Sequence, residues 1–206
     1  MSDFSAGQAR SRVFPARPGN AGMVIAAFTG MLYLVEAADT VLGGSLDREG
    51  IQPRRLDGLD GVLWAPVLHG SWQHLVANTV PVLVLGFFVL AGGFGQFVMV
   101  TATVWVVGGV GIWLVASGGT HIGASILVFG WLMFLLVRGF YARNPGQITL
   151  AAMLFLLWGG ILWGVLPGAP GISWEGHLFG ALGGLLAARM VAGADRARYG
   201  RSARSL

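Results

Sequence analysis

The sequence predicts an all-α membrane protein in which six helices each cross a lipid bilayer. Of its 206 residues, 55% are hydrophobic and only 11% are charged, and the mean hydropathy is +0.71. Soluble domains usually carry about 25% charged residues. The apolar residues are gathered into runs of about 20 residues, the length that a helix needs to cross a ~30 Å hydrocarbon core. The 34 glycines suit helices that pack closely in a membrane.

The six apolar runs fall at about 21–38, 72–91, 94–116, 120–137, 148–166 and 174–191. Residues 39–71 form the one long connection, and its part from Leu56 to Trp72 is rich enough in apolar residues to lie in the membrane interface. We therefore expect a disordered tail (1–20), one membrane domain (21–191) and a basic tail (192–206). The first run ends in Val35-Glu36-Ala37, which resembles a signal-peptidase site. A cleaved signal peptide is thus one interpretation of this run. The length of the run favours the other interpretation, a retained signal anchor.

The arginines predict the orientation in the membrane, because positive charge is retained on the cytoplasmic side. All 13 basic residues are arginine. A cytoplasmic N-terminus leaves only Arg48, Arg54 and Arg55 outside, in the long loop. It places ten inside, at positions 10, 12, 17, 138, 143, 189, 196, 198, 201 and 204. Both termini are then cytoplasmic, and the pI of about 10.6 follows from topology without a nucleic-acid partner.

This topology makes the second, fourth and sixth runs pass from outside to inside, and each begins with polar residues. His74 and Asn78 lie in the first turns of the second run, Ser125 about one turn into the fourth, and His177 near the start of the sixth. These side chains should therefore meet at one depth below the outer surface. His74 and Asn78 are four residues apart and share a helix face, as do Ser125 and Phe129.

Small residues on the sixth run should allow its histidine to approach the serine. His177, Gly180, Gly184 and Ala188 form a smooth stripe of the kind that lets two membrane helices pack closely.

At these residues the chain resembles the rhomboid family of intramembrane serine proteases. The resemblance rests on His74-x-x-x-Asn78, Gly123-x-Ser125 and His177-x-x-Gly180-x-x-x-Gly184, and it covers roughly residues 21–191. It implies a rhomboid-like six-helix bundle and a serine-type endopeptidase that cuts single-pass membrane proteins near the outer face. The run 148–166 and the loop 167–173 would be the lateral gate and the cap.

The resemblance also implies a role for each site residue. Ser125 would attack the scissile carbonyl after His177 takes its proton. His74, Asn78 and the Ser125 backbone N–H would donate hydrogen bonds to the oxyanion. Phe129 would stack on the histidine, where the family often has tyrosine.

One departure from the family leaves an alternative open. The family usually has Gly-x-Ser-Gly, whereas Ile126 follows Ser125 here and adds a β-branched side chain beside the nucleophile. The alternative is a catalytically inactive rhomboid-like protein that binds transmembrane helices. A small transporter or channel is the alternative from another class. It should carry polar residues on the third and fifth runs as well, and these runs have almost none.

The remaining polar residues suggest structural roles. His74 and Asn78 could instead cap the second run, and His69 and His121 are interpreted as structural or solvated. Neither a metal nor a cofactor is expected, because cysteine is absent and no carboxylate lies near the histidines on the predicted faces. We expect a multi-pass protein of the bacterial plasma membrane, with the lipid bilayer around it and its active site open to the outside.

Overall fold

The computed structural model describes residues 12–168 and 171–202, and there the chain forms a bundle of helices. Six helices are long and apolar enough to cross a membrane, as the sequence predicts. They are α2 (Pro18–Val41), α4 (Trp72–Val89) with the short η4 (Leu90–Gly92), α5 (Phe94–Val115), α6 (Ser125–Ala142), α7 (Pro145–Trp158) with η5 (Gly159–Val165), and α8 (Trp174–Ser202). Large apolar side chains such as Leu34 and Leu156 remain exposed on the outside of the bundle, where lipid would cover them.

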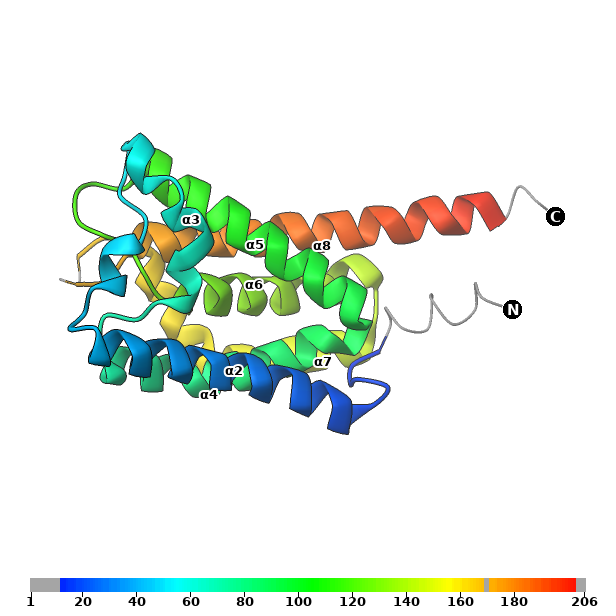
Figure 1. The fold of residues 1–206 in the computed structure, drawn as a ribbon. Coiled ribbons are helices and arrows are strands. Elements are labelled where there is room, and N and C mark those ends of the chain that lie inside the picture. Colours follow the sequence, from blue (N-terminus) through cyan, green and yellow to red (C-terminus); the bar gives the residue numbers. More distant parts are fainter. Residues whose placement is uncertain (1–11, 169–170, 203–206) are drawn as a thin grey trace.

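Helix α6 is the centre of the bundle, and it contacts α4, α5, α7 and α8 (Figure 1). In its most apolar stretch 61% of the residues are buried, against 17% for α7–η5 at the periphery. Its buried bulk includes Trp131 and Phe134. Helices α4, α6 and α8 all begin at the left-hand end in Figure 1, which we call the site end, while α2 begins and α8 ends at the other.

The glycine stripe of α8 packs against α6 as the sequence predicts. A β-carbon on Gly180 would collide with the Ile126 carbonyl of α6, and one on Gly184 would collide with the Gly130 carbonyl. Ala188 completes the stripe and is 1% exposed. The two backbones therefore approach as closely as glycine alone permits, which brings the first turn of α8 beside the first turn of α6.

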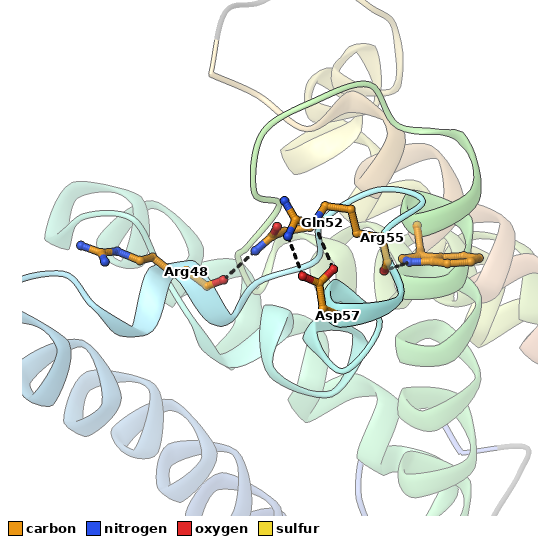
Figure 2. Close-up of polar contacts among 5 residues, drawn as sticks. Arg48, Gln52, Arg55 and Asp57 are labelled. Carbon is orange, nitrogen blue, oxygen red and sulfur yellow. Dashed lines mark hydrogen bonds and ion pairs between the residues drawn. The ribbon is translucent and has the colours of Figure 1, made fainter.

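The long connection between α2 and α4 is folded over the site end. It contains η1 (Leu46–Glu49), η2 (Leu56–Gly58), α3 (Gly61–Trp64) and η3 (Ala65–Val67). Figure 2 shows its polar contacts: Gln52 donates to the Arg48 carbonyl, the Arg55 guanidinium pairs with Asp57, and the Arg55 carbonyl accepts from Trp113 of α5. Leu56, Leu63 and Trp64 are exposed, which fits the expected position of this part in the membrane interface.

Parts of both predicted tails lie in or against helices of the described chain. Residues 1–11 lie outside the described part of the chain, but the Arg12 carbonyl accepts hydrogen bonds from Arg138 and Gln147, and α2 already begins at Pro18. Proline at the first helical positions is pre-set for the helix, which accounts for the early start. At the other end, α8 continues to Ser202. Helix α2 packs against α4 and buries Ile25 and Leu32.

Candidate active site

One cavity opens at the site end, and all five residues singled out in the sequence line it. Its volume is about 1010 Å³, and its walls come from the first turns of α4, α6 and α8, from Ile161 of η5 and from the loops before α6 and α8. The residues singled out are His74, Asn78, Ser125, Phe129 and His177. Ser71 and Ser173, which cap α4 and α8 by accepting backbone N–H hydrogen bonds, line it too. Side chains from the starts of three helices therefore line one cavity, while their depth in a membrane stays a prediction.

Ser125 is the first residue of α6, and not about one turn into it as the sequence suggested. The physical reason is Gly123, whose φ of +125° cannot continue a helix. Two residues before Gly123, His121 instead forms an isolated antiparallel β-bridge with Ile51 of the long loop. The Ser125 backbone N–H makes no hydrogen bond within the described residues, as is usual in a first helical turn. This unpaired N–H and the positive end of the α6 dipole thus lie at the cavity that Ser125 lines.

His177 is held on two sides. Its ring stacks on Phe129, with 3.9 Å between ring centroids and an angle of 6° between the planes. Its Nδ1 lies 3.0 Å from the Gly164 carbonyl of η5. Because a carbonyl only accepts, Nδ1 must carry the proton, which leaves Nε2 with its lone pair in the neutral ring. Among the described residues no side-chain hydrogen bond joins His177 to Ser125, although both line the cavity.

Gly123 separates the His74 ring from the serine. A β-carbon at this position would lie 2.9 Å from Nε2 of His74 and 3.6 Å from Oγ of Ser125. Both groups therefore lie within 4 Å of one point, and the absence of a side chain at residue 123 leaves that point open. Asn78 is 7% exposed and donates one amide proton to the His74 carbonyl at 3.1 Å, which keeps the other proton available.

Ile126 does not occupy the cavity. It is 2% exposed, and its side chain packs between α5 and α8, where Gly108 and Gly176 leave room for it. A β-carbon on Gly176 would lie 3.4 Å from Cγ1 of Ile126, and one on Gly108 would overlap Cγ2. The β-branched side chain after the serine is thus accommodated by glycines on two neighbouring helices.

His69 belongs to the site more closely than its sequence position indicates. It is 2% exposed, so the solvated interpretation is wrong, and its Nε2 accepts the Ala124 N–H at 3.3 Å, directly before Ser125. Its ring meets His74 edge-on at 5.1 Å between centroids. Burial, with a smaller contribution from the neighbouring His74, lowers the pKa of His69 to about 4. The ring therefore stays neutral at pH 7 and can accept from the loop that carries the serine.

His121 links two loops at the cavity mouth. Its Nε2 donates to the Gly118 carbonyl, so its Nδ1 accepts from the Ser173 hydroxyl at 2.7 Å. It lines the cavity but has both ring nitrogens occupied, which supports the structural interpretation. The described residues contain no group of three His, Cys, Asp or Glu side chains arranged to hold a metal ion.

The fold and the site together define a class: a polytopic helical membrane protein in which a serine and a histidine line one cavity where three helices begin. The chain belongs to the rhomboid family, because the Rhomboid domain matches residues 59–194. Uncharacterized proteins of Mycobacterium tuberculosis and Mycobacterium bovis are each 45% identical to it over 184 residues, which cover 85% of this chain and 77% of theirs. A Mycobacterium leprae protein, also uncharacterized, is 45% identical and covered to 73%. No solved structure matches the sequence significantly.

Proposed function

We propose that this rhomboid-family protein is an intramembrane serine endopeptidase that cuts single-pass membrane proteins. The observation that carries the proposal is the shared cavity, in which the candidate nucleophile, base and oxyanion donors lie together. Nε2 of His177 takes the proton from the Ser125 hydroxyl, Ser125 attacks the scissile carbonyl, and the imidazolium then protonates the leaving amine. The Ser125 N–H, Asn78 and His74 donate to the oxyanion, which is also favoured by the α6 dipole.

The peripheral α7–η5 segment supports the proposed path for substrate. Its outer surface exposes large apolar side chains, and only 17% of its most apolar stretch is buried. It is thus the membrane-spanning segment that can move with the least loss of packing. A transmembrane segment that enters beside it reaches a cavity that carries polar side chains, where a helix can unwind and present an extended peptide to Ser125.

Cleavage of a designed single-pass substrate by the purified protein in detergent tests the activity. Ser125→Ala and His177→Ala should both abolish cutting, while Ser117→Ala serves as a control on another serine that lines the cavity. Cutting that persists in either the Ser125 or the His177 variant contradicts the dyad.

A non-catalytic, helix-binding protein is the second candidate, and the missing Ser125–His177 hydrogen bond favours it. A serine-directed fluorophosphonate separates the two functions, because it reacts only with an activated hydroxyl. Labelling of Ser125 that His177→Ala removes supports the protease. A folded protein that binds transmembrane segments but takes no label supports the second candidate.

A further inference from the structure

The carbonyl of Gly164 connects the candidate base to the most loosely packed part of the bundle. Helix α7 ends at Trp158, and the chain continues as a seven-residue 3-10 helix, η5, which contacts α8. A 3-10 run of this length is uncommon and often marks a hinge. No residue of η5 is fully buried.

The Gly164 carbonyl is the only hydrogen-bond partner of the His177 ring among the described residues. In many serine proteases a carboxylate fixes the tautomer of the histidine. Here no described carboxylate bonds the ring, and a backbone carbonyl 3.0 Å from Nδ1 can do the same by accepting the Nδ1 proton. Stacking on Phe129 fixes the plane of the ring but not its protonated nitrogen.

We propose that Gly164 is a positioning residue, which holds His177 in the Nδ1–H tautomer and so makes the base depend on the position of η5. The proposal rests on the proposed function and deepens it. When α7–η5 moves aside, the carbonyl leaves with it, and the ring no longer favours a lone pair on Nε2. When the segment returns, the base is restored, so that proton transfer follows closure over the bound substrate.

Substitution of glycines in η5 offers a matched pair. A β-carbon on Gly164 would lie 3.0 Å from Nδ1 of His177 and 3.1 Å from Cζ of Phe129, so alanine there must push η5 away from the stacked rings. A β-carbon on Gly160 would meet no atom within 4 Å. Gly164→Ala and Gly160→Ala thus make the same chemical change in one segment, and only the first disturbs the histidine.

The direct readout is the 15N spectrum of the imidazoles in histidine-labelled protein, with the His177 signals assigned by a His177→Asn variant. Wild type and Gly160→Ala should show His177 protonated at Nδ1, whereas Gly164→Ala should show a mixture of tautomers. In the cleavage assay, Gly164→Ala should lower kcat about tenfold or more, with KM nearly unchanged, because the base and not substrate binding is affected. An Nε2–H ring in wild type, or a wild-type spectrum and kcat in Gly164→Ala, overturns the proposal.

A second pair of variants tests the dependence on α7 itself. Leu154 is 2% exposed and anchors α7 in the bundle, whereas Leu156 is 84% exposed and faces outward. Leu154→Ala should increase the fraction of the Nε2–H tautomer of His177, and Leu156→Ala should leave it unchanged. Equal spectra for the two variants contradict the coupling.

Failure of the proposed function is distinguished from failure of this inference. A wild-type protein that neither cuts nor takes the fluorophosphonate label rejects the protease, while the tautomer spectra still decide whether Gly164 orients the ring.

Discussion

At the scale of single residues, Gly123 controls the space between the candidate oxyanion donors and the nucleophile. Its φ of +125° lies where side chains are rarely tolerated, and its missing side chain leaves room beside the His74 ring. Because its backbone cannot continue the helix toward the N-terminus, α6 begins at Ser125.

Gly123→Ala should therefore inactivate the protein while the bundle remains folded. A β-carbon would lie 2.6 Å from Cε1 of His74 and must displace the ring. We expect kcat/KM to fall about 100-fold or more, the usual effect of losing an oxyanion donor. Gly43→Ala is the matched control, because Gly43 also has a positive φ but a β-carbon there meets no atom within 4 Å. It should cost about 1 kcal/mol of stability and leave cleavage intact, and similar activity in both variants would contradict the prediction.

His69 makes stability depend on pH in a defined window. Burial holds its pKa at about 4, below the ordinary value of 6.5. Between these values the unfolded chain binds one proton more than the folded protein, so the free energy of unfolding should fall as the pH drops from about 6.5 to about 4. The loss expected from this group is on the order of 3 kcal/mol.

Unfolding in mixed micelles between pH 7 and pH 4 measures this effect. His69→Gln, whose side chain is neutral and can still accept the Ala124 N–H, should flatten the decline over that window. An unchanged pH dependence in the variant would show that His69 is not the group responsible.

At the scale of elements, hydropathy and small-residue spacing are enough to predict the helices and their contacts. The six spanning helices, the stripe from Gly180 to Ala188 and the meeting of three helix starts all follow from local pattern. The start of α6 does not, because it depends on a backbone conformation at Gly123 that the apolar pattern conceals. The 3-10 geometry of η5 and its hydrogen bond to His177 also depend on tertiary packing, so the local pattern does not predict them.

The histidines show why the site was predicted only in part. His74 and His177 occupy helical runs, where an ionisable group is costly and points to function. His69 lies in a connection, and only the folded long loop shows that it is buried. Its hydrogen bond to Ala124 joins residues 55 positions apart, a relation that no local spacing reveals.

Ile126 stands where the family usually has glycine, and glycines on the neighbouring helices α5 and α8 make room for its side chain. In place of the glycine of the rhomboid pattern, the Ile126 side chain here fills the interface of α5, α6 and α8. Ile126→Gly should therefore destabilise the protein by about 3–5 kcal/mol through the cavity and the flexible helix start. Ile126→Val should cost only about 1 kcal/mol. Unfolding free energies of the two variants test this prediction. Higher activity with unchanged stability in Ile126→Gly would show instead that the Ile126 side chain hinders the substrate.

At the scale of the whole molecule, the positions of the cavity, the long loop and the arginines together predict the orientation in the membrane. The site end carries the folded long loop and the cavity, while α6 ends and α7 begins at the opposite end, near Arg138 and Arg143. The arginine distribution predicts that this opposite end is cytoplasmic. On that prediction the cavity opens to the outside, and water reaches it from that side.

Because the chain has no cysteine, single cysteines can report this orientation directly. Ser117 lies exposed in the loop before α6 at the site end, and Ala142 lies exposed at the last residue of α6. In intact cells a membrane-impermeant maleimide should label Ser117→Cys, and it should label Ala142→Cys only after lysis. The reverse pattern would place the cavity in the cytoplasm, and substrates would then be cut near their cytoplasmic ends. Cleavage of the designed substrate by both single-cysteine variants would show that the labelled molecules are folded. The labelling pattern then reports topology and not damage.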